Sequence, residues 1–376
     1  MPQTRRYIDH HCHGIVDADL TRPQLEALMA EAHLPAPDGC TQFDKPLGLL
    51  VRRYCAPVLG LDPFASPEDY VARRTELGGR EASRRLMQGA GMTELLIDTG
   101  HRSDTILDVP QMAEITGCAT QEVIRIEAVM EAAAKQAGSA EELVSLFAEM
   151  MEAFARDAVA LKSIVAYRVT FDIDQTRPDA GAVVKAAGDW LAALEAGESR
   201  RLDNAVLIRH ALFMALDICV ERDFPLQLHT AVGDLDIDMP KCDPTVFVPF
   251  IKQAEAMKVP LTLLHCYPFV QQATWLAEVF QNVYFDVGFT LNFTGPQAIR
   301  TMEQAMEMGP FFKQLYSSDA FGLAELHYLG RIQFERMMDK VMGQWLADGD
   351  ITLKEADRII DMITHGNAAR IYRLTE

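Results

Sequence analysis

Three histidines lie within five positions near the start of the chain, in Asp9-His10-His11-Cys12-His13. Side chains alternate between the two faces of an extended strand, so we expect Asp9, His11 and His13 to share one face. Two imidazoles two residues apart on a strand can bind a single metal ion. Because clustered histidines also occur by chance or on surfaces, this segment alone leaves both interpretations open.

Two further histidines and one aspartate each end a short apolar run, namely His229, His265 and Asp319. In a barrel of parallel strands the C-terminal strand ends meet at one rim, where the active sites of barrel enzymes lie. We therefore expect these three side chains to meet His11 and His13 there. Taken singly, each histidine could be a hydrogen-bonded core residue, and Asp319 could be a helix N-cap.

Short apolar runs separated by helical patterns recur along the whole chain. This alternation is typical of a parallel sheet built from βα units. Eight such runs predict the α/β class and a (β/α)₈ TIM barrel, formed by residues 1–376 as a single domain. The runs are Tyr7 to His13, Leu95 to Thr99, Val123 to Glu127, Val159 to Tyr167, Leu226 to His229, Leu261 to His265, Val283 to Val287 and Leu315 to Asp319.

A long segment, residues 14–92, separates the first two runs. Helical patterns at Arg22 to Ala32 and Pro67 to Gln88 predict helices within it. Because a βα loop of a barrel lies at the catalytic mouth, we interpret the segment as a helical lid inserted between strands 1 and 2. A second long loop, dense in Asp and Pro, follows the fifth run at Asp234 to Pro244.

The amino-acid composition limits the kinds of molecule that we expect this protein to bind. With 35 Lys+Arg against 54 Asp+Glu the net charge is -19, and no run of five or six basic residues is present, so we expect binding neither to nucleic acid nor to a membrane. No apolar stretch is long enough to cross a bilayer, and the short polar start is unlike a signal peptide, so we expect a cytoplasmic protein. Seven scattered cysteines without a CxxC pair argue against a disulfide framework.

The order of these polar strand ends resembles the amidohydrolase superfamily of metal-dependent (β/α)₈ enzymes, over nearly the whole chain. His11 and His13 match its HxH pair on the first strand, His229 and His265 match its histidines on the fifth and sixth, and Asp319 matches its aspartate on the eighth. The closing segment Asn367 to Tyr372 is similar to the ending of the "amidohydrolase 2" subgroup. That subgroup includes hydrolases, decarboxylases and domains fused to glutamine-synthetase-like domains.

The resemblance implies one or two divalent metal ions bound by these five residues. Zn²⁺ is the first expectation, and Mn²⁺ and Fe²⁺ are alternatives because all three accept imidazole and carboxylate ligands. Such a site leaves a coordination position open and lowers the pKa of bound water toward about 7. Asp319 would be the general base, and His265, if it binds no second metal, would polarise the substrate carbonyl.

Lys162 lies in the apolar run Val159 to Ile164, where a charged amine is costly unless it is paired or modified. In binuclear members of the family a lysine on this strand is carboxylated and bridges two metals, which would make Lys162 a metal ligand. Its alternatives are a contact to a substrate carboxylate and a structural ion pair.

Four residues just beyond predicted strand ends are candidates for substrate binding: Arg102, Arg168, Tyr267 and His327. Arginine binds carboxylates bidentately, so Arg102 and Arg168 indicate an anionic substrate. Salt bridges within the protein would explain both arginines almost as well.

The first functional expectation is a hydrolase that cleaves the amide-type C–N bond of a small, carboxylate-bearing metabolite, with the bond type implied by the resemblance. A nonoxidative decarboxylase on the same barrel is the alternative, and uronate isomerase is a more distant relative. A non-catalytic scaffold or regulatory domain is the alternative of another class, although the complete set of metal-binding side chains argues against it. Relatives are often dimers or larger, so we also expect a homo-oligomer.

Overall fold

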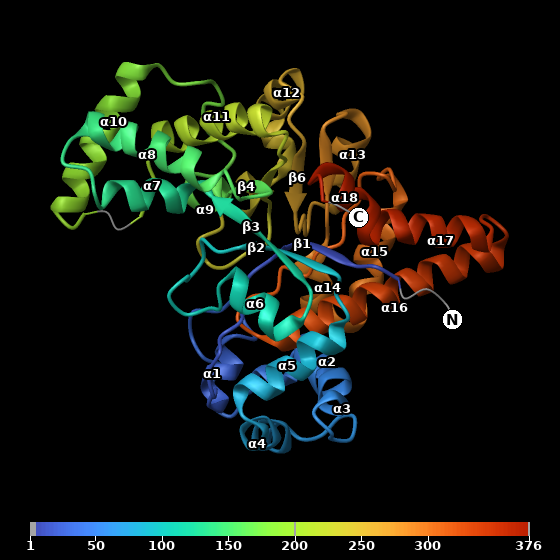
Figure 1. Ribbon diagram of the computed structural model, residues 1–376. Helices are drawn as coiled ribbons and strands as arrows, with labels where there is room; N and C mark the ends of the chain where they lie inside the picture. The colour runs from blue at the N-terminus through green and yellow to red at the C-terminus, as the bar shows by residue number, and fades with distance from the viewer. Residues whose placement is uncertain (1–4, 199–200, 375–376) are drawn as a thin grey trace.

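The computed structural model describes residues 5–198 and 201–374 (Figure 1). Within these residues one sheet of seven parallel strands forms in chain order. The strands are β1 (Ile8–Cys12), β2 (Glu94–Asp98), β3 (Ala119–Arg125), β4 (Ala160–Ser163), β5 (Leu226–His229), β6 (Leu261–Leu264) and β7 (Val283–Phe285). All of them except the start of β3 are buried, as expected for a parallel sheet that helices cover.

The eighth predicted strand, Leu315 to Asp319, is not a regular strand, yet its backbone joins the two edges of the sheet. The Leu315 N–H donates to the Phe285 carbonyl of β7 at 2.9 Å, and the Asp319 N–H donates to the His11 carbonyl of β1 at 3.1 Å. The barrel is therefore closed without a free edge. The predicted TIM barrel is confirmed, with this correction to its last strand.

The irregularity of the eighth segment has a local cause. The Asp9 carboxylate accepts the Ser318 N–H at 3.0 Å and the Ser318 hydroxyl, so a side chain replaces a backbone partner of the ladder. The next residue, Asp319, has φ +49°, which an extended strand cannot accommodate. The same carboxylate accepts the His11 N–H at 3.3 Å, so its oxygens accept from two backbone N–H groups and one hydroxyl.

The predicted fourth strand is shorter than its apolar run. Glu127 accepts hydrogen bonds from the Ser163 hydroxyl at 2.5 Å and from the Ile164 N–H at 3.0 Å, which draws this backbone out of the sheet. The rest of the run forms the short helix α9 (Val165–Arg168).

Helices cover the outside of the barrel. Among residues 5–198 and 201–374, none of them combines the length and the apolar character that crossing a bilayer requires. Helices α7, α8, α10 and α11 lie together on one side of the sheet, and α16 and α17 extend on another (Figure 1). Besides α9, the helices that follow β2 are α6 (Val109–Thr116), α7 (Ile126–Ala134), α8 (Ala140–Phe154), α10 (Ala180–Glu195), α11 (Ala205–Arg222), α12 (Val248–Ala256), α13 (Val270–Val279), α14 (Gly288–Thr294), α15 (Ala298–Glu307), α16 (Ala324–Asp348), α17 (Leu353–Asp361) and α18 (Asn367–Ile371).

Short helical turns complete this list. They are the 3₁₀ turns Met239–Cys242, Pro244–Phe247 and Gly295–Gln297 and the π-helical turn Met362–Gly366.

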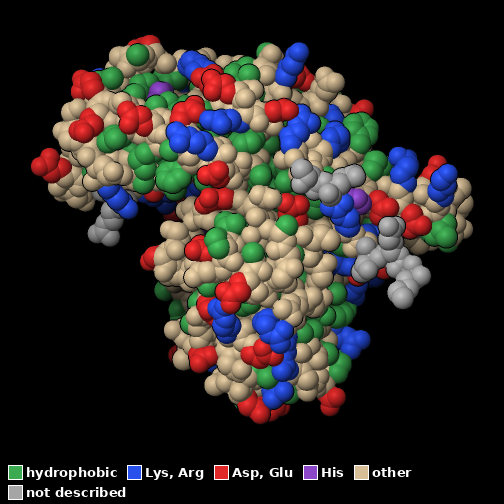
Figure 2. Space-filling model, in the orientation of Figure 1, with side chains coloured by type: hydrophobic (Ala, Val, Ile, Leu, Met, Phe, Trp, Pro, Cys, Tyr) green, Lys and Arg blue, Asp and Glu red, His purple; other side chains and the backbone are tan. Residues whose placement is uncertain are grey.

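On the face seen in Figure 2, Lys and Arg side chains are interspersed with Asp and Glu. Ion pairs between such exposed charges contribute little to stability.

The segment between β1 and β2 is helical and lies below the barrel in Figure 1. One predicted helix ends early, at Ala27, and the other is divided at Gly78, whose φ of +80° is a left-handed value that favours glycine. The helices are α1 (Arg22–Ala27), α2 (Pro46–Leu50), α3 (Ala56–Val58), α4 (Pro67–Leu77) and α5 (Gly79–Ala90), with a 3₁₀ turn at Gln42–Asp44 and a π-helical turn at Val51–Cys55.

This segment shares a hydrophobic cluster with the start of α16. Within that cluster, Arg74 of α4 donates from Nε to Glu325 of α16 at 2.9 Å, and the Tyr70 hydroxyl donates to the same carboxylate oxygen at 2.9 Å. Both ion-pair side chains are almost fully buried. The pair therefore fixes the segment to the helix that follows Asp319.

Arg74→Ala is expected to lower the free energy of unfolding by about 3 kcal/mol, because it leaves the buried Glu325 carboxylate without its cation. A urea titration measures the change. Arg80→Ala, which removes an arginine on α5 that is 48% exposed and paired with Asp17 and Glu114, is the control and should have little effect. Equal losses in the two variants would contradict the importance of the buried pair.

Candidate metal centre and pocket

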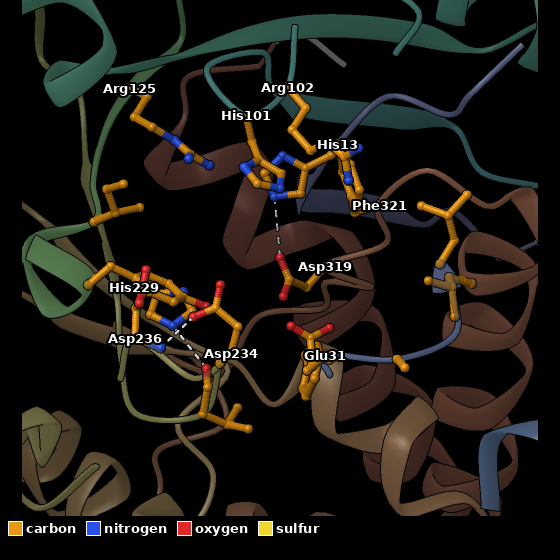
Figure 3. Close-up of a pocket in the computed structure, with 18 of the residues that line it drawn as sticks. His13, Glu31, His101, Arg102, Arg125, His229, Asp234, Asp236, Asp319 and Phe321 are labelled. Atoms are coloured by element: carbon orange, nitrogen blue, oxygen red, sulfur yellow. Dashed lines mark hydrogen bonds and ion pairs between the residues drawn. The ribbon is translucent and has the colours of Figure 1, made fainter. Parts of the chain in front are cut away.

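A pocket of about 390 Å³ opens where the strands end. Its wall includes His13 after β1, Lys162 of β4, His229 of β5 and Asp319 of the eighth segment. Figure 3 shows His13, His229 and Asp319 around one space. The pocket thus lies at the rim where barrel enzymes have their active sites.

Three imidazoles surround the Asp319 carboxylate. Its Oδ1 lies 3.2 Å from His11 Nε2 and 3.6 Å from His13 Nε2, and its Oδ2 lies 3.3 Å from His265 Nδ1. The donor atoms of His11, His265 and Asp319 lie within 4.8 Å of one another. Sequence positions more than 300 residues apart are therefore brought into one cluster, as predicted from the strand ends.

The residues present fit a divalent cation. His265 is buried, and within the described parts of the chain neither of its ring nitrogens has a hydrogen-bond partner. Buried polar atoms are nearly always satisfied, so these nitrogens indicate a missing partner. A cation beside the carboxylate would supply it, and imidazole with carboxylate is a common donor set for first-row metals.

Burial sets the protonation of this cluster. It lowers the pKa of His11 to about 3 and the pKa of His229 well below the usual range, and it also lowers the pKa of His265. These imidazoles are neutral at pH 7 and have a lone pair for a cation. Burial alone would raise the pKa of Asp319, but the surrounding histidines outweigh it and hold that pKa well below its usual range, so the carboxylate is ionised.

His229 lies beside His265, with 4.7 Å between ring centroids. Its Nε2–H donates to the Val232 carbonyl at 2.9 Å, which leaves Nδ1 free to act as a ligand. Lys162 is buried, with Nζ 3.1 Å from His11 Nε2 and 3.7 Å from Asp98 Oδ2. Burial lowers the pKa of Lys162 to about 8. Both residues therefore lie next to the cluster as the sequence predicted, while their roles remain proposals.

Asp98 and His101 lie at the site but were not among the residues that the sequence predicted for it. Asp98 ends β2 and accepts from Arg125 Nη2 at 2.6 Å, and one of its oxygens lies within 4.8 Å of donor atoms of both His11 and His13. His101 follows three residues later, and its ring centroid is 5.7 Å from that of His13. The rule that identified Asp319, a polar residue that ends a buried strand, would also have identified Asp98.

Of the four predicted substrate-binding residues, two line the pocket, Arg102 and Arg168. Tyr267 does not, because His265 and Cys266 have φ values of +69° and +57° and the chain turns immediately after β6. Tyr267 is 41% exposed and is absent from the pocket wall, so this prediction is corrected.

The prediction for His327 is corrected as well. It lies on the buried side of α16, where one of its ring nitrogens is within 4.8 Å of donor atoms of Asp9 and Cys12. It is 1% exposed and does not line the pocket. The helix that begins at Ala324 carries it behind β1 rather than to the mouth of the barrel.

A buried hydrogen-bond network orients His11. Gln227 Nε2 donates to the His10 carbonyl at 2.8 Å and to the Tyr372 hydroxyl at 2.9 Å, which leaves its Oε1 to accept from His11 Nδ1 at 2.8 Å. The proton of His11 is thereby held on Nδ1, and the lone pair on Nε2 faces Asp319.

The same network reaches His265 through Asp286. His10 contacts the Tyr372 hydroxyl through Nδ1 at 2.8 Å and Asp286 through Nε2 at 3.0 Å. The other Asp286 oxygen accepts the His265 N–H at 3.0 Å. The closing segment, singled out in the sequence, thus contributes Tyr372 to the support of the candidate ligands.

Comparison with known proteins is consistent with this arrangement. The family model described as "Amidohydrolase" matches residues 117–374. Protein fluG of Emericella nidulans is 25% identical over 407 residues; the match covers 100% of this chain and 46% of fluG, so the chain spans about half of that protein's length.

Solved structures show the same fold. A protein from Lactobacillus casei described as a metal-dependent hydrolase is 25% identical with a TM-score of 0.83, over 98% of this chain and 96% of its own. Glucuronate isomerase from Caulobacter crescentus is 16% identical with a TM-score of 0.64, over 99% of this chain and 92% of its own. The second likeness concerns the fold alone.

Gln227→Leu is expected to weaken Zn²⁺ binding by about 10- to 100-fold, because it releases the ring of His11 from its hydrogen bond. Competition with a chromophoric chelator measures the dissociation constant, and circular dichroism checks that the variant is folded. The control is Gln333→Leu, which removes another buried glutamine whose amide donates to the Gly295 carbonyl at 2.8 Å. Unchanged affinity in folded Gln227→Leu would exclude the orienting role.

Proposed function

The chain belongs to the amidohydrolase family, and from this premise we propose that it hydrolyses the amide-type C–N bond of a small, carboxylate-bearing metabolite. Family membership gives the coarser class, a metal-dependent hydrolase. The observation that carries the proposal is the ionised Asp319 carboxylate at the pocket, with three imidazoles around its two oxygens.

We assign Zn²⁺ as the metal, with Mn²⁺ and Fe²⁺ as the alternatives that the same donors accept. His11, His13 and Asp319 would hold one ion, and Lys162, His229 and His265 would complete the site of a second. When bound, such a cation polarises a substrate carbonyl and lowers the pKa of water toward about 7.

Asp319 supplies the proton transfers. Its carboxylate accepts a proton from the attacking water as the new C–O bond forms, and it then gives that proton to the nitrogen as the C–N bond breaks. The products are a carboxylic acid and an amine, which balances one water against one amide. If a single ion binds, His265 is free to donate a hydrogen bond to the carbonyl oxygen as negative charge develops there.

The pocket wall supports a substrate that bears a carboxylate. Arg102 and Arg168 line it, and a guanidinium binds a carboxylate with two parallel hydrogen bonds. Leu28 and Glu31, from the segment after α1, lie on the same wall. We propose that residues 14–92 cover the bound substrate as a lid, since a closed site shields the substrate and the attacking water from bulk solvent.

A panel of amides, lactams and γ-glutamyl conjugates, assayed with Zn²⁺-loaded protein, is expected to include at least one substrate. Asp319→Asn should lower its kcat by about 10³-fold, because the general base is lost. Asp348→Asn, at the exposed end of α16, is the control. Absence of turnover with fully metallated protein would overturn the proposal, and release of CO₂ from aromatic acids tested beside the panel would assign the decarboxylase instead.

Elemental analysis tests the role of Lys162. If it bridges two metals, the wild-type protein should contain about two ions per chain and Lys162→Met about one. An unchanged metal content in the variant would exclude the bridging role and leave a contact to a substrate carboxylate or the ion pair with Asp98 as its function. Lys185→Met, which removes an exposed lysine of α10, is the matched control.

A further inference from the structure

The charged side chains of the pocket are divided by sign. Arg102 and Arg125 lie on one side of the space in Figure 3, together with the imidazole of His101, which is neutral because burial lowers its pKa to about 3. Glu31 and Asp234 lie on the other side. Asp319 lies between the two groups in this view. The pocket therefore has a cationic wall and an acidic wall, with the candidate metal centre between them.

Several of these charges are already neutralised by the protein. The ion pairs are Arg125 with Asp98 at 2.6 Å, Arg168 with Glu131 at 3.1 Å and Arg201 with Asp236 at 2.5 Å. A side chain whose charge is already balanced by such a pair presents little net charge to a ligand. The recognition of a ligand must then depend on the groups that remain.

The remaining groups carry both signs. On the part of the chain that the structure describes, Arg102, Glu31 and Asp234 form no ion pair, and the buried Nε of Arg168 has no hydrogen-bond acceptor. The Arg102 guanidinium lies 5.7 Å from the centroid of the Phe321 ring, which also lines the pocket. The cationic wall thus has an arginine without an ion pair, and the pocket lining also includes Arg168 with its unpaired Nε–H. The two carboxylates of the acidic wall have no cationic partner among the described residues, and one Asp234 oxygen accepts the Asp236 N–H at 2.9 Å.

The acidic wall favours a cation. Burial in the pocket, together with repulsion by Asp319 and Asp234, raises the pKa of Glu31 to about 7. A positive group placed between Glu31 and Asp234 would relieve this repulsion. A ligand ammonium has the charge and the three donors for such a position.

We propose that the substrate is a zwitterionic amide, whose ammonium binds Glu31 and Asp234 and whose carboxylate binds Arg102 and Arg168. The proposal rests on the function proposed above and names its substrate class. Because Asp319 lies between the two walls, the amide bond lies between the charged ends, as in a dipeptide or a β- or γ-linked relative of one. A volume of about 390 Å³ suits a molecule of this size.

Binding of matched ligands tests the proposal without any need for turnover. Calorimetry with Zn²⁺-loaded protein compares α-, β- and γ-linked dipeptides with their N-acetylated and C-amidated forms. For at least one dipeptide, removal of either charge is expected to weaken binding by about tenfold or more. Equal affinity for the blocked forms would overturn the proposal, as would the absence of saturable binding of every dipeptide at about 10 mM.

Variants assign each charge to its wall. Asp234→Asn and Glu31→Gln should remove the preference for a free ammonium and keep the preference for a free carboxylate, and Arg102→Gln should do the reverse. Asp238→Asn, on the same loop as Asp234 but outside the pocket wall, should change neither preference. If the three pocket variants keep both preferences, the assignment to these residues is overturned.

The outcomes separate this proposal from the proposed function. Tight binding of free dipeptides without hydrolysis of any amide would support zwitterion recognition and overturn the hydrolase. Hydrolysis of N-acetylated and C-amidated peptides as fast as free ones would support the hydrolase and overturn zwitterion recognition.

Discussion

The structure depends on one carboxylate that is held among imidazoles at the mouth of a barrel. Asp319 is largely buried, and an anion there is costly unless donors or cations surround it. His11, His13 and His265 supply these contacts at 3.2 to 3.6 Å. Two of the three histidines belong to the N-terminal end of the chain, so the cluster exists only once the eighth segment has closed the sheet against β1.

Two further layers support this cluster. Behind it, Gln227 and Tyr372 fix the ring of His11, so that the orientation of this ring does not depend on a bound ligand. Asp286 fixes the backbone at His265. In front of it, the walls of the pocket come from the segments between strands. The strand ends therefore supply the chemistry and the connecting segments supply the recognition, a division common among barrel enzymes.

Much of the fold and of the candidate metal centre could be predicted from the sequence, because the patterns that specify them are local in the chain. Alternating apolar runs and helical patterns predict the barrel, and polar residues that end those runs predict the rim. His11, His13, His265 and Asp319 were all identified in this way, and Asp98 obeys the same rule. The resemblance carried by these residues also gave the family, since the residue types and their order along the chain are properties of the sequence alone.

Tertiary structure decided what depends on backbone turns and on contacts between distant segments. Left-handed φ values at His265 and Cys266 direct Tyr267 to the surface, and residue types alone do not predict these backbone angles. Gln227 meets His11 across 216 positions, and only barrel closure makes them neighbours. The sequence thus determined which side chains reach the rim, while the fold decided their partners, because ring orientation and charge balance arise from packing between segments that are remote along the chain.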